Sequence, residues 1–168
     1  MLNPVLDRWR LCALVASALM LATAHAFETF GGLAPCLLCL RQREVYWVAL
    51  ALAAGCMVLV RLRGGARWRE ASCWLLGLVF LAGAGVAAYH AGAEWKFWPG
   101  PTACGGGSGG VDPGALADFM KGEPVKAVRC DEAPWVFAGL SMAGWNAVIS
   151  LALAALSVAA ARRERGRR

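Results

Sequence analysis

Two cysteines separated by two residues offer the clearest chemistry in this chain. Cys36 and Cys39 follow Pro35 in a short polar gap between two long apolar runs, and Arg43 comes one helical turn after Cys39. Two thiols at this spacing can close a small disulfide ring, and a nearby cation or helix N-terminus favours the thiolate that exchanges disulfides. The pattern therefore predicts a redox site in a membrane protein, within reach of a lipid-soluble electron carrier.

Helical geometry refines this prediction. If a helix begins near Cys36, then Cys36, Cys39 and Arg43 lie on one face, because residues three and four apart are neighbours on a helix. The helix dipole and the Arg43 guanidinium would both favour a thiolate at Cys39. Arg43 is a candidate hydrogen-bond donor to a carrier carbonyl, and its commoner alternative is to snorkel to lipid head groups. Arg41 and Gln42 are predicted to point elsewhere on the turn.

His90 lies near the level of the cysteine pair, at the end of the third apolar run. It is expected to be either an interface residue or a donor in a carrier site. A zinc half-site is a rival interpretation of Cys36 and Cys39. A closed zinc site usually takes four nitrogen or sulfur ligands and is typical of small soluble modules, so we expect no metal.

The composition indicates a small integral membrane protein. Of 168 residues, 59% are hydrophobic and only 17% are charged, which is too apolar for an ordinary soluble domain. Spanning a hydrocarbon core takes about 20 mostly apolar residues. Four stretches qualify, at approximately 11–27, 45–62, 71–93 and 139–161. They lack strand-like alternation, so an all-α bundle of four transmembrane helices is expected, its second helix borrowing residues from the cysteine gap.

The charge distribution predicts the orientation of this bundle. The N-terminus, the gap after the second stretch and the C-terminal tail are rich in arginine and lie on one side of a four-helix topology. The loops at about 28–44 and 94–138 hold more acids than bases, so the positive-inside rule puts both termini in the cytoplasm. The net charge of +6 is thus a topology signal. Nucleic-acid binding is disfavoured, because the arginines flank membrane segments.

The first apolar stretch also resembles a secretory signal peptide. Arg8 and Arg10 precede it, and Ala24-His25-Ala26 imitates a small-residue cleavage site. We expect the segment to be retained, because four helices bury polar interior positions better than three.

Four of the seven cysteines fall in the two non-cytoplasmic loops. They are Cys36 and Cys39 in the first loop and Cys104 and Cys130 in the second. Disulfides persist on that side of a membrane, so two pairs are indicated. The second pair is either a mobile exchange pair or a static structural disulfide. The remaining three are expected to be inert small hydrophobes in or beside apolar runs: Cys12, Cys56 and Cys73.

The second loop carries two further features. A glycine-rich linker at 105–110 follows Cys104 and would let the loop move. Residues 113–120 are predicted to form a short helix on the membrane surface after a cap at Asp112, with Leu116, Phe119 and Met120 on one face.

Three parts of the sequence together resemble the disulfide bond formation protein B (DsbB) family. They are the run Pro35-Cys36-Leu37-Leu38-Cys39-Leu40-Arg41-Gln42-Arg43, the isolated Cys104 and Cys130, and Gly139-Leu140-Ser141-Met142-Ala143-Gly144-Trp145-Asn146. The resemblance covers nearly the whole chain. It departs from the family at Ala143, where relatives often have proline, and in the plain glycine-rich insert.

The resemblance implies a disulfide relay in a bacterial inner membrane. A reduced DsbA-like thioredoxin-fold protein of the periplasm would attack the Cys104–Cys130 disulfide, through a mixed disulfide at Cys104. Cys130 would then exchange with Cys36. Cys39 would pass electrons to ubiquinone or menaquinone, which Arg43 would bind or polarise.

Two other classes remain open on the sequence. A vitamin K epoxide reductase-like enzyme would also use a helical bundle, a Cys-x-x-Cys pair and a quinone-like substrate, but its motif normally belongs to a later helix. A non-enzymatic membrane protein with structural loop disulfides is the other. A transporter of that kind would be expected to carry more intramembrane ionisable residues or internal repeats.

Overall fold

The computed structural model describes residues 3–101 and 130–167. Its elements are α1 (Asn3–Asp7), α2 (Trp9–Thr29), α3 (Leu37–Arg63), α4 (Ala66–Glu94), β1 (Val136–Phe137), β2 (Leu140–Ser141) and α6 (Met142–Arg165). Four of the described helices, α2, α3, α4 and α6, are long and apolar enough to cross a membrane. The predicted all-α membrane fold of four helices is therefore confirmed. The short helix expected at 113–120 lies outside the described residues.

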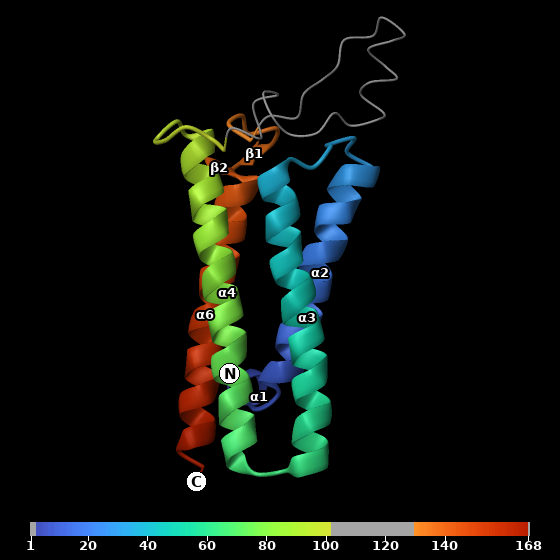
Figure 1. The fold of residues 1–168 in the computed structure, drawn as a ribbon, viewed down its shortest axis with the longest axis vertical. Coiled ribbons are helices and arrows are strands. Elements are labelled where there is room, and N and C mark those ends of the chain that lie inside the picture. The colour runs from blue at the N-terminus through green and yellow to red at the C-terminus, as the bar shows by residue number, and fades with distance from the viewer. Residues whose placement is uncertain (1–2, 102–129, 168) are drawn as a thin grey trace, which may run out of the picture.

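The four long helices are packed as two pairs, which are joined mainly by the contact between α3 and α4 (Figure 1). α4 lies against α6 along its length, α2 lies against α3, and α3 also contacts α4, whereas the backbones of α3 and α6 hardly approach one another. Both termini and the α3–α4 turn lie at one end of the bundle, and the β1–β2 hairpin and the α2–α3 connection lie at the other. The site described below is at the hairpin end.

Small residues allow the closest helix contacts. A Cβ on Gly77 of α4 would lie 3.2 Å from the Ser157 Cβ of α6, and one on Gly83 would lie 2.9 Å from Val45 Cγ1 of α3. Such small residues let helix backbones approach in a bilayer, where packing replaces the hydrophobic driving force. Trp9, at the start of α2, donates a 2.9 Å hydrogen bond from Nε1 to Ser157 Oγ and ties α2 to the same region.

Ion pairs hold the arginine-rich end together. Arg163 Nε and Arg167 lie 2.8 Å and 2.6 Å from Asp7 Oδ1, which fastens α1 to the end of α6. Arg69 of α4 lies 3.0 Å from the buried carboxylate of Glu164. The arginines at this end therefore include structural partners as well as surface charges.

Side-chain caps define the helix starts near the site. Cys36 Sγ accepts a 3.2 Å hydrogen bond from the Cys39 backbone and caps α3, so this helix starts inside the cysteine gap. Ser141 Oγ accepts a 3.0 Å hydrogen bond from the Gly144 backbone and caps α6. The hairpin before α6 was not anticipated. It turns through Ala138 and Gly139, both at positive φ, which glycine adopts without strain.

Candidate redox site

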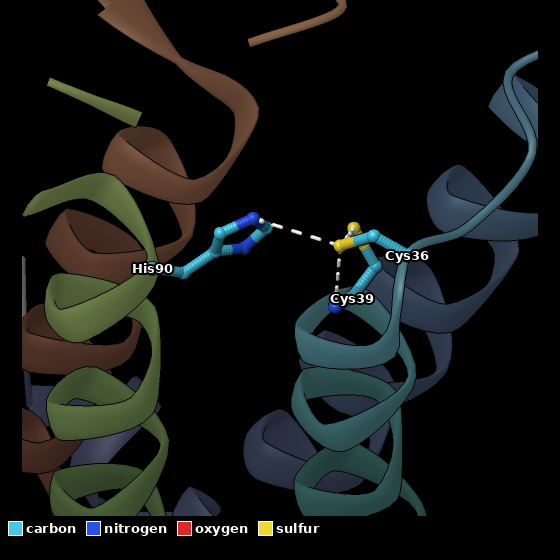
Figure 2. Close-up of side chains that lie close together, drawn as sticks. All are labelled: Cys36, Cys39 and His90. Carbon is cyan, nitrogen blue, oxygen red and sulfur yellow. Dashed lines mark hydrogen bonds between the residues drawn. The ribbon is translucent and has the colours of Figure 1, made fainter. Parts of the chain in front are cut away.

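Cys36 and Cys39 face each other at the N-terminus of α3. Their sulfurs lie 2.7 Å apart, both are free thiols, and both are positioned to close a disulfide (Figure 2). The pKa of the Cys36 thiol is raised, first by the hydrogen bond it shares with the Cys39 sulfur and then by burial. Cys36 therefore holds its proton more tightly than an ordinary thiol does.

Cys130 packs directly against this pair. It is fully buried and forms one apolar cluster with Cys36 and Leu38, against which Cys39 also packs. Cys130 is disulfide-bonded, whereas Cys104, its predicted partner, lies outside the described residues. The structure thus brings one cysteine of the second loop beside the first pair.

His90 completes the cluster from the opposite helix. It projects from α4 toward the start of α3, with Nε2 3.6 Å from Cys36 Sγ (Figure 2). The same nitrogen lies 3.7 Å from Glu94 Oε1, and Nδ1 lies 2.7 Å from the Gln42 amide nitrogen. His90 also hydrogen-bonds to the Cys130 backbone. The side chain is buried, so it belongs to this interior cluster and not to the membrane interface.

A chain of buried polar side chains extends from His90 across the bundle. The Gln42 amide oxygen accepts a hydrogen bond from Asn146 Nδ2. The Asn146 oxygen in turn accepts one from the Tyr46 hydroxyl at 2.5 Å, and Ser150 Oγ lies 2.8 Å from that hydroxyl. The expectation that Gln42 points elsewhere on the turn was wrong. Gln42 lies three residues after Cys39, a spacing that places both on one helical face.

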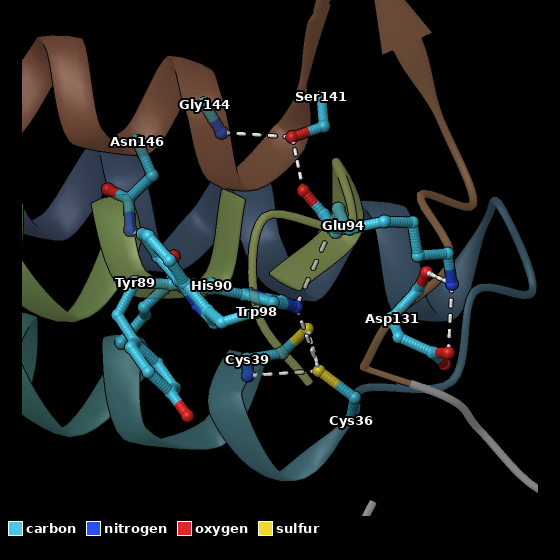
Figure 3. Close-up of polar contacts among 12 residues, drawn as sticks. Cys36, Cys39, Tyr89, His90, Glu94, Trp98, Asp131, Ser141, Gly144 and Asn146 are labelled. Atoms are coloured by element: carbon cyan, nitrogen blue, oxygen red, sulfur yellow. Dashed lines mark hydrogen bonds and ion pairs between the residues drawn. The ribbon is translucent and has the colours of Figure 1, made fainter. Parts of the chain in front are cut away.

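Glu94 is a site residue that the sequence argument missed. It is the last residue of α4, and its carboxylate is buried between His90 and Ser141, whose hydroxyl donates a hydrogen bond to Oε2 (Figure 3). A glutamate at a helix end in a loop-rich region looks like a surface residue in the sequence. Its burial depends on the hairpin folding back to place Ser141 over it.

A cavity of about 340 Å³ lies beside Cys39. This volume falls within the range of about 300–1,000 Å³ typical of small-molecule sites. Cys39, Gln42, Arg43, His90 and Glu94 line it, whereas Cys36 does not. The other walls are mainly apolar and come from α2, the hairpin and α6, and they include Met20, Leu21, Phe27, Trp135, Phe137 and Ile149. A mainly apolar cavity with a few polar side chains in its wall suits a small, largely apolar ligand.

Arg43 is held in the cavity wall by α2. Its guanidinium lies 2.5 Å from Glu28 Oε2 and 3.2 Å from the Ala24 carbonyl oxygen. An arginine has five N–H donors, so others remain for a ligand. Only 14% of its side chain is exposed, which distinguishes Arg43 from Arg41, whose side chain is exposed and pairs with Glu44. Arg43 is therefore not a snorkelling surface arginine.

A four-helix membrane bundle with a vicinal dithiol, a third cysteine packed on it and an adjoining apolar cavity has the architecture of a membrane-embedded disulfide oxidoreductase. Comparison with known proteins agrees. The family model described as "Disulfide bond formation protein DsbB" matches residues 7–160, and the chain belongs to this family. The family predicted from the sequence is thereby confirmed, and the chain is a disulfide bond formation protein.

Three similar proteins carry the name disulfide bond formation protein B. The protein from Nitrosococcus oceani is 31% identical over 147 residues, which cover 84% of this chain and 82% of that protein. The one from Methylococcus capsulatus is 32% identical, with 84% and 85% covered, and the one from Aromatoleum aromaticum is 33% identical, with 80% of each covered. No solved structure gives a significant match.

Proposed function

We propose that this disulfide bond formation protein is a quinone-dependent thiol oxidase that reoxidises a DsbA-like, thioredoxin-fold dithiol protein of the bacterial periplasm. One observation carries the proposal. Cys39 and Arg43 line the same apolar cavity, while Cys36, one turn away from Cys39, packs against Cys130 and does not line the cavity. When bound in this cavity, a quinone supplies an acceptor for two electrons and two protons.

The proposed relay conserves electrons and protons at each exchange. A thiolate of the reduced partner attacks Cys104 of the Cys104–Cys130 disulfide, and the second partner thiol resolves the mixed disulfide, so the partner leaves oxidised. The Cys130 thiolate then attacks Cys36 of the Cys36–Cys39 disulfide and releases the Cys39 thiolate. Attack by Cys104 on the Cys130–Cys36 bond restores the loop disulfide. Two electrons and two protons have then moved from the partner to Cys36 and Cys39.

The second half of the reaction takes place at the cavity. The Cys36–Cys39 bond re-forms as two electrons leave through Cys39, the sulfur that lines the cavity. Arg43, which lines the same cavity, would hold the quinone there through a hydrogen bond from its guanidinium. Glu28 and the Ala24 carbonyl orient the guanidinium for this role. His90, 3.6 Å from Cys36, is placed to exchange the proton of that thiol.

The proposed location is the bacterial inner membrane, with both termini in the cytoplasm. The termini share one end of the bundle with the α3–α4 turn, and arginine is concentrated there. The positive-inside rule assigns such an end to the cytoplasm. The cysteine cluster at the opposite end would then face the periplasm, where a soluble dithiol partner can reach it.

The test uses the full chain in lipid nanodiscs with a reduced thioredoxin-fold donor and a short-chain quinone. Ubiquinone and menaquinone analogues are compared side by side, and quinone absorbance and donor thiols are followed together. We expect stoichiometric turnover that Cys39→Ser abolishes. Cys56→Ser, a buried free thiol in the same helix, is the matched control and should retain turnover. Turnover by Cys39→Ser would remove that sulfur from the chemistry.

A second variant separates an exchange role from a structural role for the loop cysteines. Cys104→Ser should stop oxidation of the protein donor while leaving the Cys36–Cys39 pair able to react with quinone after chemical reduction. If Cys104→Ser merely lowers stability and leaves donor-driven turnover intact, the loop disulfide is structural.

A further inference from the structure

We propose that the reduced form of this site binds Zn²⁺ through Cys36, Cys39 and His90, and that the disulfide form does not. The sulfurs of the two cysteines and a ring nitrogen of His90 all lie within 4.8 Å of one another in the bundle interior. The sequence argument against a metal considered His90 near the cysteine pair but judged a histidine there to be more often an interface residue than a ligand. The fold supplies a third ligand from α4, which no spacing along the chain reveals.

The distances suit tetrahedral zinc. Zinc lies about 2.3 Å from a thiolate and about 2.0–2.1 Å from an imidazole nitrogen, so a bound sulfur and nitrogen are separated by roughly 3.6 Å. Cys36 Sγ and His90 Nε2 lie 3.6 Å apart. Two bound sulfurs are separated by about 3.8 Å, and the present separation is 2.7 Å. A movement of the Cys39 sulfur by about 1 Å into the cavity that it lines closes this difference.

Charge and ligand softness favour zinc over the common hard cations. Two thiolates and a neutral imidazole form a soft set that suits Zn²⁺, whereas Mg²⁺ and Ca²⁺ prefer oxygen ligands. The two thiolate charges neutralise the dication, so the buried complex carries no net charge. Binding releases the two thiol protons. The Cys36–Cys39 disulfide has no thiolate to offer, and metal binding therefore depends on the redox state.

The surroundings of His90 can support metal binding at Nε2. Nδ1 would then carry the proton and need an acceptor, and the Gln42 amide lies 2.7 Å from it. Each side-chain amide has one donor end and one acceptor end. If the amide groups of Gln42 and Asn146 both flip, donor and acceptor change places in the hydrogen bonds between His90 and Tyr46, and no bond in that chain is lost. Such a partner on the second ring nitrogen is typical of zinc-bound histidine. A water can complete the coordination and leaves the complex neutral.

The consequence for activity rests on the proposed thiol oxidase function. A zinc ion held between Cys36 and Cys39 occupies both thiolates, so neither can form the disulfide or pass electrons to the cavity. Zinc would therefore inhibit the reduced enzyme reversibly and leave the oxidised enzyme unaffected.

The binding test needs neither donor nor quinone. The full chain in nanodiscs is reduced with a phosphine, cleared of reductant and titrated with Co²⁺, then with Zn²⁺ in competition. We expect one equivalent of cobalt, thiolate charge-transfer bands and tetrahedral d–d bands, which Zn²⁺ removes. His90→Gln should weaken binding by at least about tenfold. His25→Gln is the matched control, because His25 is an exposed histidine of α2, and its binding should equal that of the unaltered chain.

Two results would overturn the proposal. If His90→Gln and the unaltered chain bind cobalt with equal affinity, the metal is held by the two cysteines without His90. If the disulfide form binds cobalt, metal binding does not depend on the redox state. A second measurement avoids the variants: in Cd²⁺-loaded protein with isotopically labelled histidine, NMR should show a cadmium–nitrogen coupling to one ring, and its absence would exclude His90 as a ligand.

Activity then separates this inference from the proposed function. If no donor is oxidised in any condition, the thiol oxidase proposal fails while the metal titration still decides the zinc site. If the enzyme turns over and also binds zinc, the rate should fall at one equivalent of Zn²⁺ and recover on chelation. An unchanged rate would refute inhibition.

Discussion

The buried hydrogen bond between Tyr46 and Asn146 is expected to be a measurable link between the two halves of the bundle. The Tyr46 hydroxyl of α3 donates to Asn146 Oδ1 of α6 at 2.5 Å, and both side chains are buried. The backbones of α3 and α6 hardly approach one another, so side chains carry this contact. Interhelical hydrogen bonds in membrane proteins contribute about 0.6 kcal/mol on average and up to about 1.7 kcal/mol.

The loss of stability expected for each single substitution depends on which buried polar groups it leaves without a hydrogen-bond partner. Tyr46→Phe removes the donor to Asn146 and the partner of Ser150, so we expect a loss of about 1–3 kcal/mol in the free energy of unfolding. Asn146→Ala removes that acceptor and the donor to Gln42 and should cost a similar amount. Because the two variants delete the same bond, their effects should fall short of additivity by about 0.6–1.7 kcal/mol.

A double-mutant cycle measures this coupling. The unaltered chain, Tyr46→Phe, Asn146→Ala and the double variant are unfolded reversibly in mixed micelles by increasing the fraction of denaturing detergent, and helicity is followed. Tyr46→Phe combined with Ser157→Ala is the control, because Ser157 also lies on α6 but bonds to Trp9. That pair should be additive. A Tyr46–Asn146 coupling below about 0.3 kcal/mol would refute the role assigned to the bond.

Three further outcomes are expected. In the proposed quinone-dependent reaction, Glu28→Gln should raise the KM for quinone with kcat largely kept, because Arg43 loses the anion that orients it, whereas Glu44→Gln at the exposed pair should change neither constant. Ser141→Ala should lower the free energy of unfolding by about 1–3 kcal/mol, because it removes both the α6 cap and the donor to the buried Glu94 carboxylate. The hydrogen bond from Arg163 holds the pKa of the Asp7 carboxyl below its ordinary value of 3.8. The stabilisation is therefore present above about pH 4 and lost as the pH falls through the lowered pKa, and Asp7→Asn should remove this acid-dependent loss in unfolding assays.

The sequence predicted those features that depend on composition and on spacing within one helix. Four apolar stretches without alternation determine four helices, because the backbone in lipid must satisfy its own hydrogen bonds. The spacing of Cys36, Cys39 and Arg43 brings Cys39 and Arg43 to one cavity once α3 starts in the cysteine gap. The same spacing rule applies to Gln42, and applying it there would have placed that residue at the site.

Other parts of the site depend on contacts between distant segments. Glu94 is buried because Ser141, 47 residues later, donates to it, and Arg43 is oriented by Glu28, which belongs to a different helix. The hairpin that positions Ser141 has strands of two residues each, and strands this short cannot be predicted from an alternating apolar and polar pattern. Asn146 was visible in the sequence as an isolated polar residue in an apolar run, but its partners on α3 were not.

The different positions of Cys36 and Cys39 follow from where α3 begins. Cys36 is the N-cap of α3 and stays on the loop side, packed with Cys130, whereas Cys39 lies one turn into the helix and lines the cavity. Both sulfurs therefore lie beside Cys130, but only the Cys39 sulfur also lines the cavity. A thiol–disulfide relay needs this arrangement, because protein thiols must reach one sulfur while a lipid-soluble acceptor reaches the other. A zinc ion at the proposed site would bind both sulfurs. It would therefore block both the disulfide exchange at Cys36 and the transfer of electrons from Cys39.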